Sequence, residues 1–442
     1  MRGAEKIRGK APAAMISAPG SGQGKSMVTA ALARLHRNAG RKVRVFKHGP
    51  DFLDPMVLER ASGNPVYQLH PWMTGEAECR FRLAEAAREA DLVLVEGSMG
   101  LFDGSPSSAD LAALTGIPVL PVIDAWAMAQ TFAAVALGLA RYRDDVSVHE
   151  VIANRVAGAG HADLLGDGLP DDIRLLGAVP RTEALSIPDR HLGIVQADEV
   201  RDLDQRLDQA AEVLCNAGLD QLPGSVSLAA EVPPPPPPLL KGMRIAVARD
   251  EAFAFLYRAN LELLETMGAQ LHFFSPMRDR ELPPADALWL PGGYPELHAK
   301  TLASNLPMLL AVRNHHAAGR PVVAECGGLM YCMERLIDDE GDEHGMSALL
   351  PGRAVMTGGL AGLGLQSLPT PHGDLRGHAF HHSRLETGLH PVARTWHGEH
   401  KGGSEGEAVY RDRRLTASYF HAYFPSAPQA VAALFAGEEL VR

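Results

Sequence analysis

The segment Ala13–Ser26 reads AAMISAPGSGQGKS, and it decides the fold of the first half of the chain. An apolar run of strand length, Ala13–Ser17, leads into a glycine-rich turn, and a helical pattern over Met27–Asn38 follows. This order forms a phosphate cradle, because glycines let backbone N–H groups curl around phosphate and the helix N-terminus adds its dipole. The residues predicted to bind phosphate are Gly22, Gln23, Gly24 and Lys25, and Ser26 is the predicted ligand of Mg²⁺.

The motif departs from the full phosphate-loop pattern at one position. That pattern has Gly where Pro19 stands, so the chain carries the shorter form GxGKS. A flexible glycine-rich turn is the alternative interpretation. The preceding strand and the following helix favour phosphate binding.

Short apolar runs alternate with helical stretches on both sides of this segment. Strands that alternate with helices predict a doubly wound, mostly parallel sheet in an α/β domain of the P-loop type. The further predicted strands are Lys42–Lys47, Leu92–Val95, Val119–Ile123, Val151–Asn154 and Leu175–Val179. The further predicted helices are Ala77–Glu89 and Ala127–Tyr142.

Six consecutive prolines, Pro233–Pro238, mark the clearest boundary in the chain. They cannot continue a helix and predict a stiff polyproline II spacer; a proline-rich docking ligand is the alternative. The alternation then restarts in a second α/β domain, with strands at Met243–Ala248, Leu271–Phe274, Ala287–Leu290 and Val322–Ala324 and a helix at Ala254–Met267. We therefore expect a first domain over 1–231, a linker over 232–241 and a second domain over 242–442.

The composition of the 442 residues is that of a globular protein, with 46% hydrophobic and 21% charged residues. A formal net charge of −11 argues against a nucleic-acid partner. No apolar run reaches the roughly 18 residues of a membrane span, and Met1–Pro12 lacks the apolar core of a signal peptide. We expect a cytoplasmic protein without a membrane or nucleic-acid partner.

Charged residues follow two of the predicted strands in the first domain. Lys47 and Asp51 stand at the end of one strand, and Glu96 stands at the end of the next. Ligands of open α/β sheets bind at the carboxyl ends of the strands, so these groups should converge on the phosphate loop. The carboxylates of Asp51 and Glu96 suit Mg²⁺ beside Ser26, and Lys47 suits the charge on a phosphoryl group in transfer.

Three stretches carry a resemblance to a known family: Lys47–Pro55 (KHGPDFLDP), Pro71–Met73 (PWM) and Val95–Gly104 (VEGSMGLFDG). They resemble the cobyrinic or hydrogenobyrinic acid a,c-diamide synthases, whose ligase half is similar to dethiobiotin synthetase. The resemblance implies ATP as a substrate and gives metal roles to Ser26, Asp51 and Glu96. It also implies phosphate roles for Lys25 and Lys47, an acidic position near the reacting carboxylate for Asp103, and an adenine pocket around Asn154, Pro180 and Arg181.

In the second domain a cysteine stands at a sharp strand-to-helix turn, Ala324–Met330 (AECGGLM). This is the pattern of a nucleophile elbow, in which the turn exposes Sγ, the helix dipole favours the thiolate and the next N–H can bind an oxyanion. The alternative is a buried structural cysteine, which is what we expect Cys332 in the next helix to be. We predict that Cys326 is a nucleophile.

A nucleophilic thiol requires a base, and His421 ends a late apolar stretch, Leu415–His421. Met243–Phe435 resembles the class I glutamine amidotransferases. The resemblance implies that Cys326 is the nucleophile, that His421 is the base and that the amides of Gly293 and Gly327 bind the oxyanion. That class usually has Glu where Tyr423 stands, so no third catalytic residue is assigned.

Arg376–Ser383 holds three histidines, His378, His381 and His382. Strand alternation places His378 and His382 on one face and His381 on the other. Structural residues, or residues of a glutamine tunnel, are favoured over metal ligands.

The two resemblances together imply an ATP- and glutamine-dependent amidation of a corrin polycarboxylate in cobalamin biosynthesis. Cys326 releases ammonia from glutamine, a carboxylate is activated as an acyl phosphate, and a protected route for the ammonia is expected. The alternatives are a cobyric acid synthase, and a P-loop ATPase switch with an inactive docking domain. The proline-, arginine- and alanine-rich composition suggests a GC-rich genome, which favours the aerobic route and its metal-free substrate. The order of the two amidations and a homodimeric assembly stay open.

Overall fold

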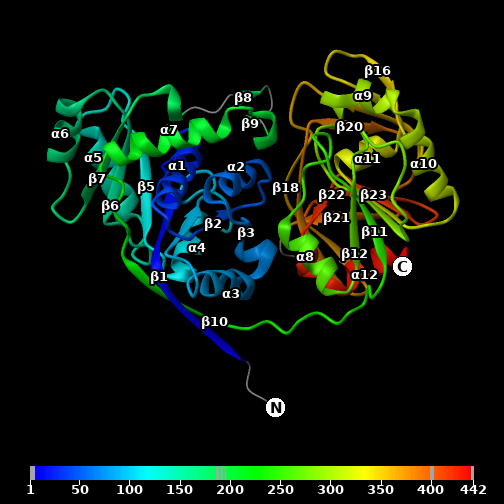
Figure 1. Ribbon diagram of the computed structural model, residues 1–442, viewed down its shortest axis with the longest axis horizontal. Helices are drawn as coiled ribbons and strands as arrows, with labels where there is room; N and C mark the ends of the chain where they lie inside the picture. The colour runs from blue at the N-terminus through cyan, green and yellow to red at the C-terminus, as the bar shows by residue number, and fades with distance from the viewer. Residues whose placement is uncertain (1–4, 186–188, 191–192, 195, 399–402, 440–442) are drawn as a thin grey trace. The chain divides into compact units, whose positions relative to one another are not determined.

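The computed structural model describes residues 5–185, 189–190, 193–194, 196–398 and 403–439. The chain forms two compact units, Met1–Pro233 and Pro234–Arg442 (Figure 1). The division falls after the first of the six consecutive prolines. Among the described residues no helix is long and apolar enough to cross a membrane.

The first unit is built on a parallel sheet with the strand order β3-β2-β4-β1-β5-β6-β7. Its neighbouring strands pair in parallel throughout. The strands are β1 Lys6–Ser17, β2 Val43–His48, β3 Tyr67–Leu69, β4 Leu92–Glu96, β5 Val119–Asp124, β6 Glu150–Val156 and β7 Arg174–Pro180, with β8 Asp189–Arg190, β9 Gly193–Ile194 and β10 Ser225–Glu231 outside this order. The helices are α1 Lys25–Asn38, α2 Leu53–Ser62, the π-helix η1 Pro71–Gly75, α3 Glu76–Ala86, α4 Ser108–Thr115, α5 Thr131–Arg141, α6 Ala159–Asp167 and α7 Leu203–Asn216, with short 3₁₀ turns η2 Glu183–Leu185 and η3 Ala197–Glu199.

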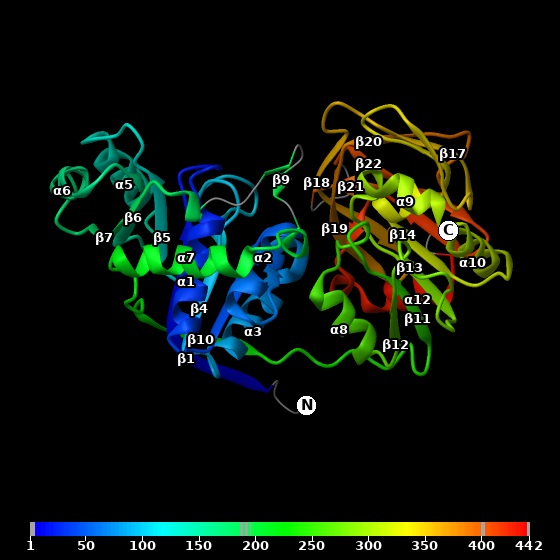
Figure 2. The same ribbon diagram turned by 45° about the horizontal axis from the view of Figure 1, so that its top comes forward.

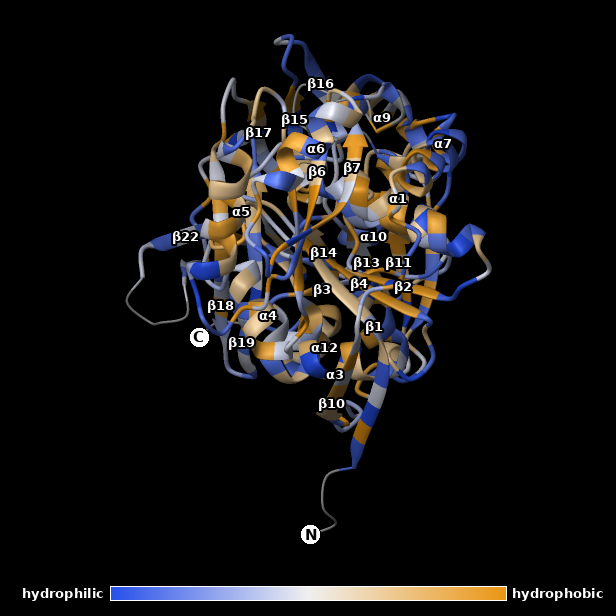
Figure 3. Ribbon diagram, turned by 90° about the vertical axis from the view of Figure 1, so that its left-hand side faces the viewer, coloured by the Kyte–Doolittle hydropathy of each residue, from blue (hydrophilic) through white to orange (hydrophobic). Residues whose placement is uncertain are grey.

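Both faces of this sheet are covered. Successive strand residues such as Met15 and Ile16 point to opposite faces, yet both are fully buried. On one face α1, α2 and α7 pack into a core with Ile16, Leu94 and Val122. Figure 3 shows the hydrophobic residues gathered on β2, β4, β6 and β7. The predicted doubly wound parallel fold is therefore confirmed.

Strand β1 is longer than the sequence predicted. Its first half pairs antiparallel with β10, in a register that runs from Lys6 opposite Glu231 to Pro12 opposite Ser225. Figure 1 shows this half of β1 extending beyond the parallel sheet. Sequence reasoning missed it because Lys6, Arg8 and Lys10 interrupt any apolar run.

The second unit has a sheet with the order β12-β11-β13-β14-β23-β22-β21-β18-β19-β24 and a smaller sheet with the order β16-β15-β17-β20. The first five strands of the larger sheet pair in parallel, and the others pair antiparallel. The strands are β11 Arg244–Ala248, β12 Gln270–Phe274, β13 Ala287–Leu290, β14 Val322–Glu325, β15 Met333–Ile337, β16 Glu343–Gly345, β17 Leu350–Met356, β18 Gly362–Thr370, β19 Gly373–His381, β20 Ser383–Glu386, β21 Ala393–His397, β22 Glu405–Asp412, β23 Leu415–Ser418 and β24 His421–Ala422. The helices are α8 Arg258–Thr266, α9 Ala299–Ser304, α10 Leu306–Ala317, α11 Gly327–Cys332 and α12 Pro428–Ala436, with 3₁₀ turns η4 Pro295–His298 and η5 Phe424–Ser426.

The parallel part of this sheet also separates two cores. Leu288 and Leu290 face a core with α9, α10 and α11. Ala287 and Trp289, which alternate with them, face a core with α8 and α12. Figure 2 shows α9 and α10 on one side of β13 and β14 and α8 and α12 on the other. The second domain is α/β, as predicted.

Two predicted helices begin later than expected. The segment before α8 is extended, because the Phe255 amide donates to the Gly292 carbonyl at 3.0 Å. Before α5, Ala127 has a left-handed backbone with φ 59°, and the Trp126 amide donates to the Asp124 carboxylate at 2.9 Å. Polar side chains and loop contacts thus replace the first helical turn at both places.

We predict that Gly328→Ala destabilises the second unit. A Cβ at position 328 would lie 2.0 Å from the Leu290 carbonyl oxygen, so α11 could not pack against β13. Such overpacking costs about 1–3 kcal/mol, which corresponds to about 2–4 °C of melting temperature per kcal/mol. Thermal unfolding followed by circular dichroism measures it. Gly345→Ala is the control, since its Cβ would meet nothing within 4 Å; equal melting temperatures for both variants would contradict the packing argument.

Candidate functional site

The phosphate loop joins β1 to α1 in the first unit. Gly24 ends the loop with a left-handed backbone, φ 96°, immediately before Lys25 opens the helix. The Lys25 ammonium folds back and donates to the Gly20 carbonyl at 3.1 Å. Burial lowers the pKa of Lys25, and the nearby Lys47 lowers it further. The loop thus holds a partly buried cation that an anionic phosphate would stabilise.

Gln23 ties this loop to two other strand ends. Its side-chain oxygen accepts from the Asp124 amide at 2.8 Å, and its carbonyl accepts from the Asn154 side chain at 2.9 Å. The Asn154 side-chain oxygen accepts in turn from the Arg155 amide at 3.0 Å. Asn154 therefore braces the phosphate loop, and its amide still has one further donor and one acceptor position for a base.

The buried Lys47 ammonium lies among three carboxylates, of which Glu96 is buried and Asp51 is exposed. Its Nζ is 2.6 Å from Asp54, 3.1 Å from Glu96 and 3.3 Å from Asp51. Ser26 Oγ donates to Glu96 Oε1 at 2.6 Å. The predicted metal residues Ser26, Asp51 and Glu96 are thus brought together, with Lys47 as their common neighbour.

Charges in this cluster support one another against burial. Burial disfavours the Lys47 ammonium, but Asp54, Glu96 and Asp51 outweigh it and hold its pKa well above the usual value. Burial raises the pKa of Glu96 to about 7, with repulsion from Asp54 added and attraction to Lys47 opposing it. Removing the cation would leave the carboxylates buried without compensation.

Two buried carboxylate oxygens of the cluster, Glu96 Oε2 and Asp54 Oδ1, have no hydrogen-bond partner. Ser17 Oγ, at the end of β1, is also buried without one. Carboxylate and hydroxyl oxygens are the donors that Mg²⁺ prefers, so the chemistry of these residues suits this metal. Among the described residues, however, no three His, Cys, Asp or Glu side chains are already arranged to hold a metal ion. Sequence reasoning did not assign Asp54, although it is the second carboxylate of KHGPDFLDP.

Asp103 lies in the loop after β4. Its Oδ2 accepts from the Gly100 amide at 3.0 Å, and the Leu101 amide donates to the Ala18 carbonyl at 2.8 Å. The loop that carries Asp103 is therefore attached to the start of the phosphate loop.

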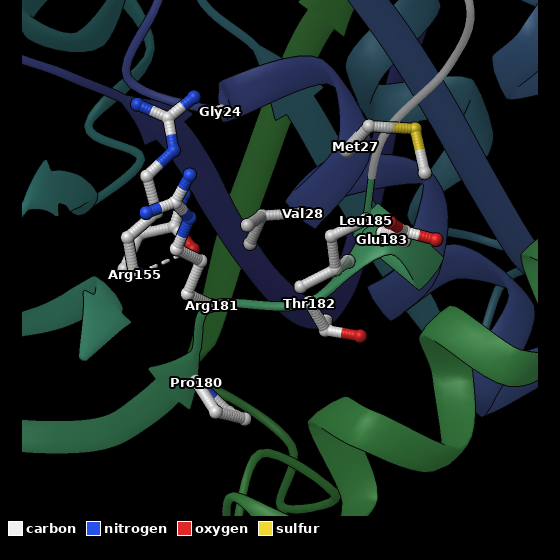
Figure 4. Close-up of a pocket in the computed structure, with 10 residues that line it drawn as sticks. Gly24, Met27, Val28, Arg155, Pro180, Arg181, Thr182, Glu183 and Leu185 are labelled. Atoms are coloured by element: carbon white, nitrogen blue, oxygen red, sulfur yellow. Dashed lines mark hydrogen bonds between the residues drawn. The ribbon is translucent and has the colours of Figure 1, made fainter. Parts of the chain in front are cut away.

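A pocket of about 470 Å³ opens next to the phosphate loop (Figure 4). The residues that line it are Gly24, Met27, Val28, Asn154, Arg155, Pro180, Arg181, Thr182, Glu183 and Leu185. Figure 4 shows the Arg155 and Arg181 side chains next to each other on one side, with Met27 and Leu185 opposite. Predicted residues Gly24, Asn154 and Pro180 thus meet around one concave site whose size and mixed polarity suit a nucleotide base and ribose.

In the second unit Cys326 occupies the turn between β14 and α11. Its backbone has φ 48° and ψ −106°, a strained conformation for a residue with a side chain. The Cys326 amide donates to the Ser418 carbonyl at 2.8 Å, which fixes the turn to the end of β23. The geometry is that of the predicted elbow.

The predicted oxyanion donors lie close to each other. A Cβ on Gly327 would be 3.1 Å from the Gly293 backbone nitrogen. The strand-end loop after β13 therefore packs directly against the elbow. Two backbone N–H groups at this junction can serve an oxyanion formed at Cys326.

Burial favours the protonated form of the Cys326 thiol. Burial raises its pKa, the Glu296 carboxyl raises it further, and the Gly327 amide acts in the opposite direction. The expectation that the helix dipole favours a thiolate is therefore wrong for this state, because desolvation outweighs the dipole. The reaction needs a base.

His421 is placed by the pairing of β24 with β19, which sets it opposite His378. The two rings stack with centroids 4.9 Å apart, and His378 Nδ1 lies 3.0 Å from the Tyr257 hydroxyl. Burial lowers the pKa of His421, followed by the effects of His378 and His381. The imidazole is neutral and can accept a proton.

Gly292 links His421 to the elbow. A Cβ at Gly292 would lie 2.3 Å from His421 Cε1, so a larger residue would displace the imidazole. Since Gly293, the next residue, contacts Gly327, one loop touches both the base and the nucleophile turn. The loop thus contacts His421 on one side and Gly327, the residue after Cys326, on the other.

Glu325 is a buried carboxyl group that sequence reasoning missed. Its oxygens accept from the Ala422 amide at 2.8 Å and from Trp289 Nε1 at 2.9 Å, and burial raises its pKa to about 7. Through the Ala422 amide it fixes β24, the strand that carries His421. Tyr423, where a carboxylate was expected for the class, is buried against Tyr257 with ring centroids 5.7 Å apart. The signal for Glu325 was its position directly before Cys326.

The three histidines of Arg376–Ser383 have different neighbours. His378 stacks on His421, while His381 stacks on Tyr419 at 3.8 Å. His381 Nε2 lies 3.2 Å from Glu407, and the His382 ring meets the edge of Phe380. The two stacking contacts attach β19 to the Tyr419–His421 segment.

Comparison with protein families divides the chain in the same way. Residues 14–194 match the CobQ/CobB/MinD/ParA nucleotide binding domain. Residues 244–429 match the CobB/CobQ-like glutamine amidotransferase domain.

Three curated proteins align over nearly the full chain. The hydrogenobyrinate a,c-diamide synthase of Stutzerimonas stutzeri is 57% identical over 424 residues, 96% of this chain and 98% of that protein. The enzyme of the same name from Pseudomonas aeruginosa is 55% identical, over 97% of this chain and 98% of that protein. The cobyrinate a,c-diamide synthase of Herminiimonas arsenicoxydans is 49% identical, over 96% of each chain.

We predict that Lys47→Met destabilises the first unit, and more strongly at pH 8 than at pH 5. Removing one partner of a buried ion pair costs about 3–5 kcal/mol. Without the cation the pKa values of the carboxyl groups rise further. A carboxyl group whose pKa is higher in the folded than in the unfolded state destabilises the fold once the pH rises above its unfolded-state pKa. Melting temperatures at the two pH values measure this effect.

Lys42→Met is the control for this prediction. Lys42 forms a surface ion pair with Glu89 at 2.7 Å, and such pairs contribute about 0–1 kcal/mol. Small, pH-independent shifts in both variants would show that the Lys47 cluster does not depend on its cation.

Proposed function

The chain belongs to the family of hydrogenobyrinate and cobyrinate a,c-diamide synthases, and on that premise we propose that it converts the a and c carboxylates of a corrin into amides with ATP and glutamine. The observation that carries the proposal is the presence, in one chain, of a phosphate loop beside the Lys47 cluster and of a cysteine elbow beside a neutral histidine. The first can activate a carboxylate and the second can release ammonia. The enzyme is a glutamine-dependent ligase.

In the glutaminase half-reaction Cys326 Sγ attacks the side-chain carbonyl of glutamine while His421 takes the thiol proton. The Gly293 and Gly327 amides stabilise the oxyanion of the tetrahedral intermediate. His421 then returns the proton to the departing ammonia, leaving a glutamyl thioester that water hydrolyses. Burial keeps His421 neutral at the start of this cycle, as the proton transfer requires.

In the ligase half-reaction a corrin carboxylate attacks the γ-phosphate of ATP to form an acyl phosphate, which ammonia converts to the amide. We assign Lys25 and Lys47 to the phosphates, and Asn154 and Pro180 to the base. Ser26, Asp51, Asp54 and Glu96 would hold Mg²⁺, which neutralises phosphate charge when bound. Lys47 can then turn from its carboxylates to the phosphoryl group in transfer.

The metal-free corrin, hydrogenobyrinate, is the proposed substrate. The relatives at 57% and 55% identity carry that name, and the relative at 49% carries the name cobyrinate a,c-diamide synthase. Turnover of both corrins by the purified enzyme decides between them. These relatives do not favour the two alternatives, a cobyric acid synthase and an ATPase switch. We further propose that the enzyme is cytoplasmic and homodimeric.

We predict that Cys326→Ser abolishes amidation with glutamine and preserves amidation with ammonium salts. The thiolate is needed only to release ammonia, so the ligase half-reaction should keep its rate. Amide formation with each nitrogen donor measures this. Cys332→Ala, at the end of α11, should keep both activities. Loss of both activities in Cys326→Ser with an unchanged melting temperature would contradict two separate sites.

We predict that Glu96→Gln and Asp51→Asn each lower the ligase rate by about 10²-fold or more, because each removes a charge that holds the metal and phosphates. Ammonium-dependent amidation at saturating Mg²⁺ measures this effect. Glutaminase activity is the internal control and should not change. An unchanged ligase rate in both variants would show that these carboxylates lie outside the reaction.

A further inference from the structure

Glu296 is a buried carboxyl group beside the nucleophile turn that the mechanism above does not use. It lies in η4, Pro295–His298, directly after the loop that carries Gly293. Its side chain is within the protein, with a relative exposure of 8%. A buried carboxyl next to a reactive thiol needs a reason, because desolvation of a carboxylate is costly.

The contacts of its neighbour place Glu296 at the catalytic turn. A Cβ on Gly327 would lie 2.8 Å from Pro295 Cδ, so the turn that carries Glu296 packs against the residue after the nucleophile. After burial, Glu296 is the group that most raises the pKa of Cys326. The turn that carries Glu296 therefore borders the place where a molecule bound at Cys326 would lie.

Glu296 differs from the other carboxyl groups around Cys326 in its partners. Glu325 accepts hydrogen bonds from Trp289 and Ala422, and Glu407 faces His381 at 3.2 Å. In the part of the chain that the structure describes, no Lys, Arg or His forms an ion pair with Glu296. Burial accordingly raises its pKa to about 8. The group is ready to pair with a cation that a ligand supplies.

We propose that Glu296 binds the α-ammonium group of glutamine and so selects α-amino acid amides over simple amides. This inference rests on the proposed glutaminase function. When the side-chain amide of glutamine sits at Cys326, only a short run of methylene groups separates it from the α-ammonium. That cation is buried with the ligand and needs an anionic acceptor. Burial alone favours the protonated Glu296, but an ammonium group beside it stabilises the carboxylate, so binding and ionisation occur together.

The test compares glutamine with glutaramate, the analogue that lacks the α-amino group, in the full-length enzyme. For wild type we expect kcat/KM for ammonia release to favour glutamine strongly. Glu296→Gln keeps the shape of the side chain and removes the charge, so this preference should fall by about tenfold or more, mainly through a higher KM for glutamine. Activity with glutaramate should change little.

Glu407→Gln is the matched control. It removes another carboxylate that acts on Cys326, and it should leave the preference for glutamine intact. Alkylation of Cys326 by iodoacetamide and ammonium-dependent amidation check that each variant is folded and its thiol intact.

Three results would overturn the inference: an unchanged preference in Glu296→Gln, equal losses with both amides, or the same loss of preference in Glu407→Gln. If wild type releases no ammonia from glutamine at all, the proposed function itself fails. That outcome is distinct from a wild-type glutaminase whose preference does not depend on Glu296.

Discussion

Parallel pairing of the central strands is the constraint on which both functional sites depend. Parallel strands end at the same edge of a sheet, so the loops that follow them must meet there. In the first unit β1, β2 and β4 deliver the phosphate loop, Lys47 and Glu96 to one edge. In the second unit β13, β14 and β23 deliver Gly293, Cys326 and Ser418 to another. Residues that are tens of positions apart in sequence thus become neighbours because their strands pair, and not because their side chains bind one another.

Burial has different consequences at the two sites. In the first unit the Lys47 ammonium keeps its charge, because Asp54, Glu96 and Asp51 outweigh the cost of burial. In the second unit burial favours the neutral forms of Cys326 and His421. A fixed cation suits phosphoryl transfer, in which negative charge is spread over several oxygens. A neutral thiol and imidazole suit a reaction that should start only when a substrate is bound.

The sequence predicted those parts of the fold and site that local chemistry marks. Glycine-rich turns after apolar strands located the phosphate loop and the elbow, and the charged residues at strand ends located Lys47 and Glu96. Asp54 lies only seven residues after Lys47, and it was missed because it stands inside α2 rather than at the end of a strand. Glu325 was missed because its role depends on Trp289 and Ala422, which are far from it in sequence. The pairing of β10 with β1 was missed because Lys6, Arg8 and Lys10 interrupt the apolar pattern of β1. The state of Cys326 was misjudged because a turn motif indicates the helix end but does not reveal how deeply the thiol is buried.

The two half-reactions form one enzyme only if nitrogen released at Cys326 becomes the amide made at the Lys47 cluster. The most direct measurement supplies glutamine labelled with nitrogen-15 in its side-chain amide, together with ATP and the corrin, and follows the product by mass spectrometry. We expect the label to enter both new amides of the corrin, and ATP and glutamine to be consumed in equal amounts. A corrin product without label, or glutamine consumption with no labelled amide, would contradict it.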